Sequence, residues 1–521
     1  MDQHELPNVA TTAVLGCQNL RWSLTPCPTF RSLILLASVA LGGLLPSSLA
    51  GVGYSQLAPE DSSETYYEVL GQGSYGTVYR LPDDKATVVK VSDFSWNSYL
   101  SLVNLREVFF LNHLNHPHII KPKKAELIHD AHGMKLEMFL PYGTVPQRAP
   151  GDLLAAGSQA LAYLHQLGMA HEDLKPQHLL EVDQQTKMLD FGSCSLDINR
   201  PSDHNKTTLY YRSPENLFGE YGFEQALDIW SLAITILRKQ NTAHQLDLVF
   251  SLGDVPDAND RMIYGLFKSL GTPQESQPFF KKWLQTKTDL TLFNSRANSY
   301  ERYPIKAYPA PQLEKLYPEL SAELLEALRR MLDFNPSTRI TAEELTHLPL
   351  IAAASNNLRP ATAASEPKQL FPFAQATQHD PILSQEFAML AALCESLDLD
   401  DYIFFESAGI FAQMDEKFNA TAQSAHKLAL WESAAIYFAL VLYDETVIAS
   451  DLLTHQFEHF YRGGEFGRFA ERFLNKTQFS IIHDHAFRLA SRQGSTKGPQ
   501  GRAWISALKA QVISEGRILL R

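Results

Sequence analysis

Three glycines set between two strand-forming segments constrain this 521-residue chain more than any other feature. They are Gly71, Gly73 and Gly76, with Tyr66 to Leu70 before them and Thr77 to Tyr79 after them. The flanking residues favour strands, so the segment predicts a β-turn-β flap. Because glycine carries no side chain, such a flap can bring its backbone N–H groups against a phosphate. Val78 then follows where an apolar side chain could cover an aromatic base.

The same glycine spacing also occurs in dinucleotide-binding sites. There it lies between a strand and a helix, with an acidic residue about 20 positions further on. Here strand-forming residues continue on both sides, and the strand-like run Thr-Val-Val ends in Lys90. This favours a cation beneath the flap over a dinucleotide site. A flexible glycine loop without a ligand is the plain alternative.

The residues after Lys90 predict a helix and then a strand. Leu105 to Leu114 has apolar residues at helical spacing, so Glu107 projects from one face of a helix. Glu107 is either a functional carboxylate or a solvated helix charge. Leu136 to Gly143 predicts a strand that ends in a hinge, and Glu137 is an unusual charge within it.

Two further motifs complete a recognisable series. One runs from His171 to His178 and reads His-Glu-Asp-Leu-Lys-Pro-Gln-His; the other is Asp190-Phe-Gly192. In this order and spacing, the motifs resemble those of eukaryotic-type Ser/Thr protein kinases. Two later segments resemble the cyclin-dependent and MAP kinase branch: 208–215 and 267–274.

The resemblance covers residues 64–352 and implies an α+β, bilobal protein kinase fold, with a small β-rich N-lobe and a large α-helical C-lobe. It implies an enzyme that transfers the γ-phosphoryl group of ATP to a protein serine or threonine hydroxyl, with Mg²⁺ as the metal and Mn²⁺ as the alternative. The implied ATP-binding residues are Leu70, Gly71, Gly73, Gly76, Val78, Lys90 and Glu107. The resemblance implies that Glu107 forms an ion pair with Lys90 and orients it on the phosphates. The implied catalytic residues are Asp173, which orients the substrate hydroxyl, and Lys175 beside the transferred group. Asp190 would hold the metal, while His171, Asp228 and the pair Glu215–Arg339 would be structural.

Glu172 departs from the kinase pattern, which has an arginine before the catalytic aspartate. In kinases that arginine receives the phosphate of a phosphorylated activation loop. A carboxylate instead repels a group that carries about −1.5 to −2 charge. Thr207, Thr208, Tyr210 and Tyr211 are therefore poor candidates for a phosphorylation switch that acts through this position.

His178 is the second departure, because it stands where kinases have a metal-binding asparagine. Magnesium prefers oxygen ligands, whereas imidazole suits zinc, copper, iron or nickel. A neutral His178 could still form a hydrogen bond with Asp173, but as a metal ligand beside Asp190 it would give a weakened contact. Two hypotheses follow: an active kinase, or a nucleotide-binding pseudokinase that acts as a scaffold or regulatory binding module.

Composition limits the partners. The net charge of −13 excludes nucleic acid as the main partner, since binding phosphate needs a basic surface. Protein substrates or partner proteins fit better. Four scattered cysteines are too few for a disulfide framework and indicate a reducing compartment. Cys194, beside the metal motif, is predicted to be a packed small residue, with a redox role as the alternative.

Residues 1–58 are predicted to be a leader whose apolar segment, 33–50, resembles a signal-peptide core or a marginal membrane anchor. Membrane contact is expected only through this segment. Export would move the kinase away from ATP, so an ATP-containing cytoplasm, of its own or a host cell, is favoured. Secretion, membrane anchoring and an unused apolar leader remain as alternatives.

The rest of the chain predicts a linker and a second domain. Residues 353–380 are rich in Ala, Ser, Thr, Pro and Gln, which is typical of a linker. Residues 381–521 predict an all-α domain of about five helices, with a buried helix from Ala429 to Leu442. His455 and His459 have helical metal-ligand spacing but lack the glutamate that a zinc protease needs. His483 and His485 are expected to be surface residues, and the mildly basic stretch after Lys497 a solvated face.

Overall fold

The structure is a computed structural model that divides into two compact units, residues 1–64 and 65–521. The first unit, and with it the predicted apolar leader, lies outside the residues that the structure describes. The described residues are 68–73, 75–196, 206–239, 258–294, 299–309, 313–357, 381–418, 424–443, 446–462, 464–482 and 498–515.

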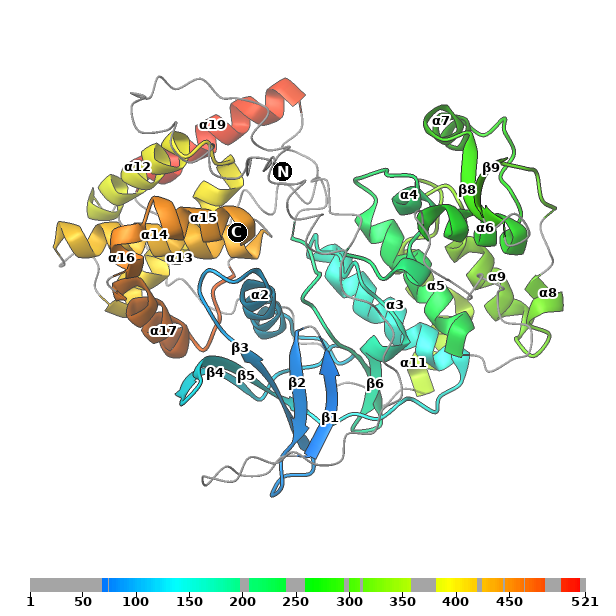
Figure 1. The fold of residues 1–521 in the computed structure, drawn as a ribbon, viewed down its shortest axis with the longest axis horizontal. Helices are drawn as coiled ribbons and strands as arrows, with labels where there is room; N and C mark the ends of the chain where they lie inside the picture. The colour runs from blue at the N-terminus through cyan, green and yellow to red at the C-terminus, as the bar shows by residue number, and fades with distance from the viewer. Residues whose placement is uncertain are drawn as a thin grey trace, which may run out of the picture. The chain divides into compact units, whose positions relative to one another are not determined.

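An antiparallel five-stranded sheet forms the small lobe, with strand order β1-β2-β3-β5-β4 (Figure 1). Its strands are β1 (Glu68–Gly73), β2 (Gly76–Arg80), β3 (Thr87–Asp93), β4 (Lys124–Asp130) and β5 (Gly133–Pro141). β-branched residues make β3 a stable central strand, and Val88 and Val89 are buried in the core. In the register, Lys90 lies opposite Val78 of β2 and Met138 of β5. The lysine is therefore fixed in the middle of the sheet.

Helix α2 (Tyr99–His113) follows β3 and is the helix predicted around Glu107. Its residues from Ser101 to Leu111 are all buried, including the polar ones. A helix buried all round must be covered on more than one side. α2 contacts β3 and β5 of the sheet, and also helices α14 (Ala425–Leu442) and α15 (Thr446–His455) from the far end of the chain.

The large lobe is mainly helical (Figure 1). Its helices are α3 (Pro150–Gln166), α4 (Pro214–Leu217), α5 (Glu224–Lys239), α6 (Ala258–Leu270), α7 (Pro278–Thr286), α8 (Leu313–Leu316), α9 (Ala322–Met331), α10 (Ala342–Thr346) and α11 (Pro349–Asn357). Two hairpins accompany them: β6 (Leu179–Val182) with β7 (Gln185–Met188), and β8 (Asp289–Asn294) with β9 (Ser299–Pro304). Gly157 of α3 lets α5 approach closely, because a Cβ there would lie 2.7 Å from a methyl carbon of Leu232.

A buried ion pair joins two distant segments of the large lobe. Arg339 donates hydrogen bonds of 2.6 and 2.8 Å to the two carboxylate oxygens of Glu215, and the side chains are 0% and 2% exposed. The predicted Glu215–Arg339 pair is present. Its two parallel hydrogen bonds compensate the cost of burying both charges.

The C-terminal helical region comprises the described residues from 381 to 515. Its helices are α12 (Pro381–Ser396), α13 (Asp401–Phe418), α14, α15, α16 (Glu458–Arg462), α17 (Glu465–Thr477) and α19 (Gly498–Glu515). The described part thus has seven helices, more than the five or so predicted, because short breaks divide the segment after α14. The predicted buried helix is present, and Leu430 to Leu442 of α14 are all buried.

Two predictions about the ends of elements need correction. α11 runs to Asn357, so the helix enters the segment predicted to be a linker from residue 353. His455 ends α15 and Glu458 begins α16, so His455 and His459 do not share one continuous helix as predicted.

Among the described residues, α14 alone is long and apolar enough to span a membrane, and 72% of that helix window is buried within the structure. Such burial is typical of a core helix.

Candidate active site

The glycine flap is formed by β1, β2 and the turn between them. A Cβ built on Gly76 would lie 2.5 Å from the carbonyl oxygen of Val91. The backbone of Gly76 also has a φ of 129°, which residues with a side chain adopt only at a high conformational cost. The fold itself therefore requires Gly76. Among the described residues, no atom lies within 4 Å of a Cβ built on Gly71 or Gly73, so these two glycines leave space for a ligand.

The two apolar residues predicted at this site lie on the flap strands. Leu70 is 38% exposed on β1, and Val78 is half-buried on β2. Val78 lies directly beside Lys90 in the sheet register. An apolar side chain is thus available at the wall of the site.

Lys90 and Glu107 form the predicted ion pair, with Nζ and Oε2 2.6 Å apart. Glu107 is 5% exposed at its side chain and comes from α2. Burial opposes the charge of Lys90, but the Glu107 and Asp190 carboxylates outweigh it and raise the lysine pKa above its ordinary value. The buried cation therefore stays charged, and it lies within electrostatic reach of the predicted metal ligand.

Asp228 at the start of α5 holds the catalytic loop. Its carboxylate accepts hydrogen bonds from the backbone N–H groups of His171 (2.8 Å) and Glu172 (2.9 Å). Nε2 of His171 lies 2.9 Å from the carbonyl oxygen of Leu189, which precedes the metal motif. The structural residues predicted here do fix the loop, and Glu172 adopts a positive φ of 64° within it.

Asp173 is held from both sides. Lys175 donates to its Oδ2 at 2.7 Å, while the hydroxyl and the backbone N–H of Thr208 donate to Oδ1 at 2.6 and 2.8 Å. Lys175 also donates to the hydroxyl of Thr208 at 3.1 Å. From the sequence, Thr208 was considered a poor phosphorylation candidate and the start of the 208–215 segment, and this contact was not predicted. Its position as the first residue of that segment was the available signal.

His178 binds both neighbouring aspartates. Its Nδ1 lies 2.8 Å from the backbone carbonyl oxygen of Asp173, and its Nε2 lies 3.0 Å from Oδ2 of Asp190. Each of these contacts places a ring nitrogen of His178 against an oxygen of a neighbouring aspartate, so the imidazole bridges the two residues. The prediction that His178 can bond to Asp173 is borne out, although through the backbone. The contact with Asp190 was not predicted.

Asp190 keeps an accessible carboxylate, since its side chain is 39% exposed. Burial opposes its ionisation, but the hydrogen bond and charge of His178, together with the charge of Lys90, hold the pKa of Asp190 well below its usual range. The carboxylate is thus ionised and already in contact with the imidazole of His178. A metal ion would have to compete with that group.

The segment after the metal motif is tied to α2 and to the catalytic loop. Arg106 of α2 donates to the carbonyl oxygen of Cys194, and the hydroxyl of Thr207 donates to the carbonyl oxygen of Glu172 at 2.6 Å. Burial raises the pKa of the Cys194 thiol well above its ordinary value. Cys194 therefore fits the predicted packed small residue.

No group of three or more His, Cys, Asp or Glu side chains among the described residues could hold a metal ion by itself. Magnesium is often bound by one or two carboxylates together with substrate phosphates. Asp190 can supply such a carboxylate, whereas His178 offers a nitrogen that already donates to it. Of Asp190 and His178, only Asp190 therefore fits as a ligand for a metal ion that is also bound by the nucleotide phosphates.

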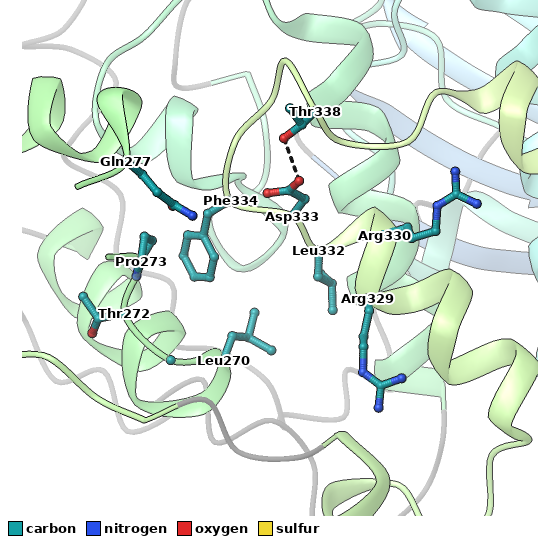
Figure 2. Close-up of a pocket in the computed structure, with 11 residues that line it drawn as sticks. Leu270, Thr272, Pro273, Gln277, Arg329, Arg330, Leu332, Asp333, Phe334 and Thr338 are labelled. Atoms are coloured by element: carbon teal, nitrogen blue, oxygen red, sulfur yellow. Dashed lines mark hydrogen bonds between the residues drawn. The ribbon is translucent and has the colours of Figure 1, made fainter. Parts of the chain in front are cut away.

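A cavity of about 420 Å³ lies elsewhere in the large lobe (Figure 2). Its lining comes from the connection between α6 and α7 and from the segment after α9, and includes Leu270, Pro273 and Phe334. Thr338 donates to Asp333 at its rim at 2.7 Å. No flap or catalytic-loop residue lines this cavity, so it is separate from the nucleotide site.

The remaining sequence candidates are dispersed. His455 pairs with Asp451 at 3.2 Å, and the ring of His459 packs on Phe460. Lys509 of the basic stretch binds Glu395 and Asp401 within the helical region, at 3.2 and 3.1 Å. His483, His485 and residues 353–380 beyond Asn357 lie outside the described residues.

Residues 65–351 match the family model of the protein kinase domain. The chain therefore belongs to the protein kinase family, and its curated relatives place it near the cyclin-dependent branch. It is 27% identical over 300 residues to cyclin-dependent kinase 7 of Xenopus laevis, covering 53% of this chain and 78% of that protein. It is 28% identical to cyclin-dependent kinase D-1 of Arabidopsis thaliana, covering 53% and 68%. With cyclin-dependent kinase 7 of Carassius auratus the identity is also 28%, covering 53% and 79%.

Proposed function

We propose that the chain is an active protein serine/threonine kinase that transfers the γ-phosphoryl group of ATP to a protein hydroxyl. The observation that carries the proposal is the buried Lys90–Glu107 pair, at 2.6 Å, beside the glycine flap. Burying a lysine and a carboxylate is costly, even when the two are paired. A site that had lost its function would not be expected to keep such a pair.

Each residue has a separate task in this proposal. The flap glycines admit the phosphates, and Lys90 binds them after being oriented by Glu107. Asp173 accepts the proton of the substrate hydroxyl, while Lys175 lies beside it to stabilise negative charge. ATP with Mg²⁺ supplies the phosphoryl group and neutralises charge on it. Asp190 would hold the metal, and Mn²⁺ is the alternative ion.

Serine/threonine specificity is supported by Lys175 and Thr208. Together with Asp173 they form a closed set of hydrogen bonds between 2.6 and 3.1 Å. This set ties the catalytic loop to the segment that precedes Tyr211, so the base and the substrate-binding segment are positioned together.

The second candidate is a nucleotide-binding pseudokinase. His178 favours it, because its Nε2 lies 3.0 Å from Oδ2 of Asp190, the carboxylate that the metal needs. The chain would then bind ATP but transfer its phosphate slowly or not at all, and would act as a scaffold or regulatory binding module. Protein partners fit both candidates.

We further propose three modules: a leader of residues 1–58, the kinase domain of 64–352 and the C-terminal helical region. The kinase must work where ATP is present, so we place it in an ATP-containing cytoplasm of its own or a host cell. Accessibility of an engineered tag to protease in intact cells tests this placement.

Transfer from γ-labelled ATP tests the activity. The full chain is incubated with a generic basic protein substrate and either Mg²⁺ or Mn²⁺, beside Asp173→Ala. Labelling that depends on Asp173 supports the kinase. If neither metal supports labelling while ATP still raises the melting temperature, the pseudokinase replaces it.

A further inference from the structure

Helix α2 contacts three parts of the candidate site at once. Besides binding Lys90 through Glu107, it donates from Asn104 to the carbonyl oxygen of Tyr75 in the flap turn, at 3.0 Å. Val103 of α2 lies close to Gly192 of the metal motif, because a Cβ built on Gly192 would be only 3.2 Å from Cγ1 of Val103. Asn104 and Glu107 are three residues apart, so they share a face of the helix. A shift of α2 would therefore disturb the flap, the ion pair and the metal motif together.

The opposite face of α2 is covered by the chain's own C-terminal helical region. Phe109 is two residues after Glu107, hence about 200° around the helix. Its ring packs edge-on against Phe438 of α14, with centroids 6.1 Å apart, and both rings are fully buried. At the end of α2, Asn112 donates to the carbonyl oxygen of Gln478 at 3.1 Å.

Trp96, in the loop before α2, is the centre of this contact. It is 5% exposed, and its ring lies edge-on to Phe438 and Phe466, with centroids at 6.4 and 5.8 Å. Its carbonyl oxygen accepts a hydrogen bond from the hydroxyl of Tyr437. Gly467 leaves room for the indole, since a Cβ there would lie 3.1 Å from Nε1 of Trp96.

Polar contacts extend the same interface to both sides. Ser450 of α15 donates to the carbonyl oxygen of Asn97 at 2.9 Å, and His129 of β4 lies 3.2 Å from the carboxylate of Glu471 on α17. The apolar centre with a polar rim has the composition of a specific, stable interface. A second protein could reach this face of α2 only by displacing α14.

We propose that the C-terminal helical region is a built-in positioning element for α2, and that Trp96 and Phe438 are positioning residues for the Lys90–Glu107 pair. The inference rests on the proposed function of the same site. The chain thereby supplies from its own sequence the surface that holds Glu107 towards Lys90, so no separate protein is needed for that step.

The test is a double-mutant cycle in the full-length chain. Trp96→Ala is combined with Glu107→Gln, and both the transfer rate and the Kd for ATP are measured. If Trp96 acts through Glu107, Trp96→Ala alone lowers the rate roughly tenfold or more but costs less than about twofold in the Glu107→Gln background. Trp96→Phe, which keeps an aromatic ring, recovers most of the rate.

Trp504→Ala is the matched control, because Trp504 lies on α19 and is 37% exposed. It should leave the rate and the Kd unchanged. If Trp96→Ala fails to fold, Gly467→Ala replaces it, since one methyl group then crowds Trp96 while every other side chain is kept. It should lower the rate roughly two- to fivefold, again only when Glu107 is present.

Equal losses with and without Glu107, or no loss in folded Trp96→Ala and Gly467→Ala, would overturn the inference. Absence of transfer in the unmodified chain would refute the proposed function alone. The cycle in the Kd for ATP then still decides whether Trp96 and Glu107 are coupled, because it does not depend on transfer.

Discussion

His178 lies between the backbone of Asp173 and the carboxylate of Asp190, at 2.8 and 3.0 Å. An asparagine there could offer an oxygen to a metal without bringing a positive charge. We therefore expect His178→Asn to raise Mg²⁺-dependent transfer roughly 10- to 100-fold, which corresponds to about 1.4–2.7 kcal/mol of the barrier. Steady-state rates over a series of Mg²⁺ and Mn²⁺ concentrations check this.

His132→Asn is the control, because His132 lies exposed in the turn between β4 and β5. It should not change the rate. An unchanged rate in His178→Asn as well would mean that the histidine does not limit metal binding.

Glu432 on α14 is a second residue whose charge state matters. It is 4% exposed, and burial and the neighbouring Glu386 raise its pKa from the usual 4.5 to about 8. The folded chain thus holds a proton that the unfolded chain loses, so this contribution to stability is full below about pH 4 and declines until about pH 8. Two pH units within that window correspond to roughly 2–3 kcal/mol.

We expect Glu432→Gln to raise the melting temperature at pH 8 and to flatten its decline between pH 6 and pH 8. Thermal unfolding followed by circular dichroism measures both, with Glu319→Gln as the exposed control. Parallel declines in Glu432→Gln and the unmodified chain would show that this proton is not held in the folded state.

At the scale of elements, α2 and the flap depend on one side-chain contact. Asn104 is 5% exposed and donates to the carbonyl oxygen of Tyr75 at 3.0 Å. Asn104→Ala removes a hydrogen bond worth about 1 kcal/mol, so the KM for ATP should rise roughly three- to tenfold. Asn115→Ala, at an exposed position just after α2, is the comparison. A KM that stays the same would show that the flap does not need this contact.

Periodicity and motif spacing predicted most of these elements. The flap, α2, β5 and α14 follow from local apolar patterns, and the Lys90–Glu107 and Glu215–Arg339 pairs follow from the family resemblance. The contacts of Thr208 and His178 could not be predicted in this way, because they depend on how the chain folds back upon itself. The break between α15 and α16 was missed because helical spacing alone does not indicate where a helix ends.

At the scale of the whole molecule, the packing of the helical region on α2 was beyond sequence reasoning. Trp96 and Phe466 are 370 positions apart, and no local pattern in either segment indicates the other. The burial of α2 from Ser101 to Leu111 results in part from that contact. A helix this apolar and this buried predicts a covering partner, but not which segment provides it.

Stability of the large lobe depends on the Glu215–Arg339 pair. Arg339→Met leaves the buried carboxylate without its cation, so the free energy of unfolding should fall by about 3–5 kcal/mol. Urea unfolding followed by tryptophan fluorescence measures the change, and Arg330→Met provides an exposed arginine for comparison. A loss no larger than that of Arg330→Met would contradict the structural role.

The most direct test of the account is calorimetric titration of ATP into the full chain, with and without divalent ions. The account predicts binding that is strengthened by Mg²⁺ or Mn²⁺, weakened by Lys90→Met, and made independent of metal by Asp190→Asn. If no heat of binding is found with either ion, the residues around the flap do not form a nucleotide–metal site, and the proposed phosphoryl transfer is contradicted.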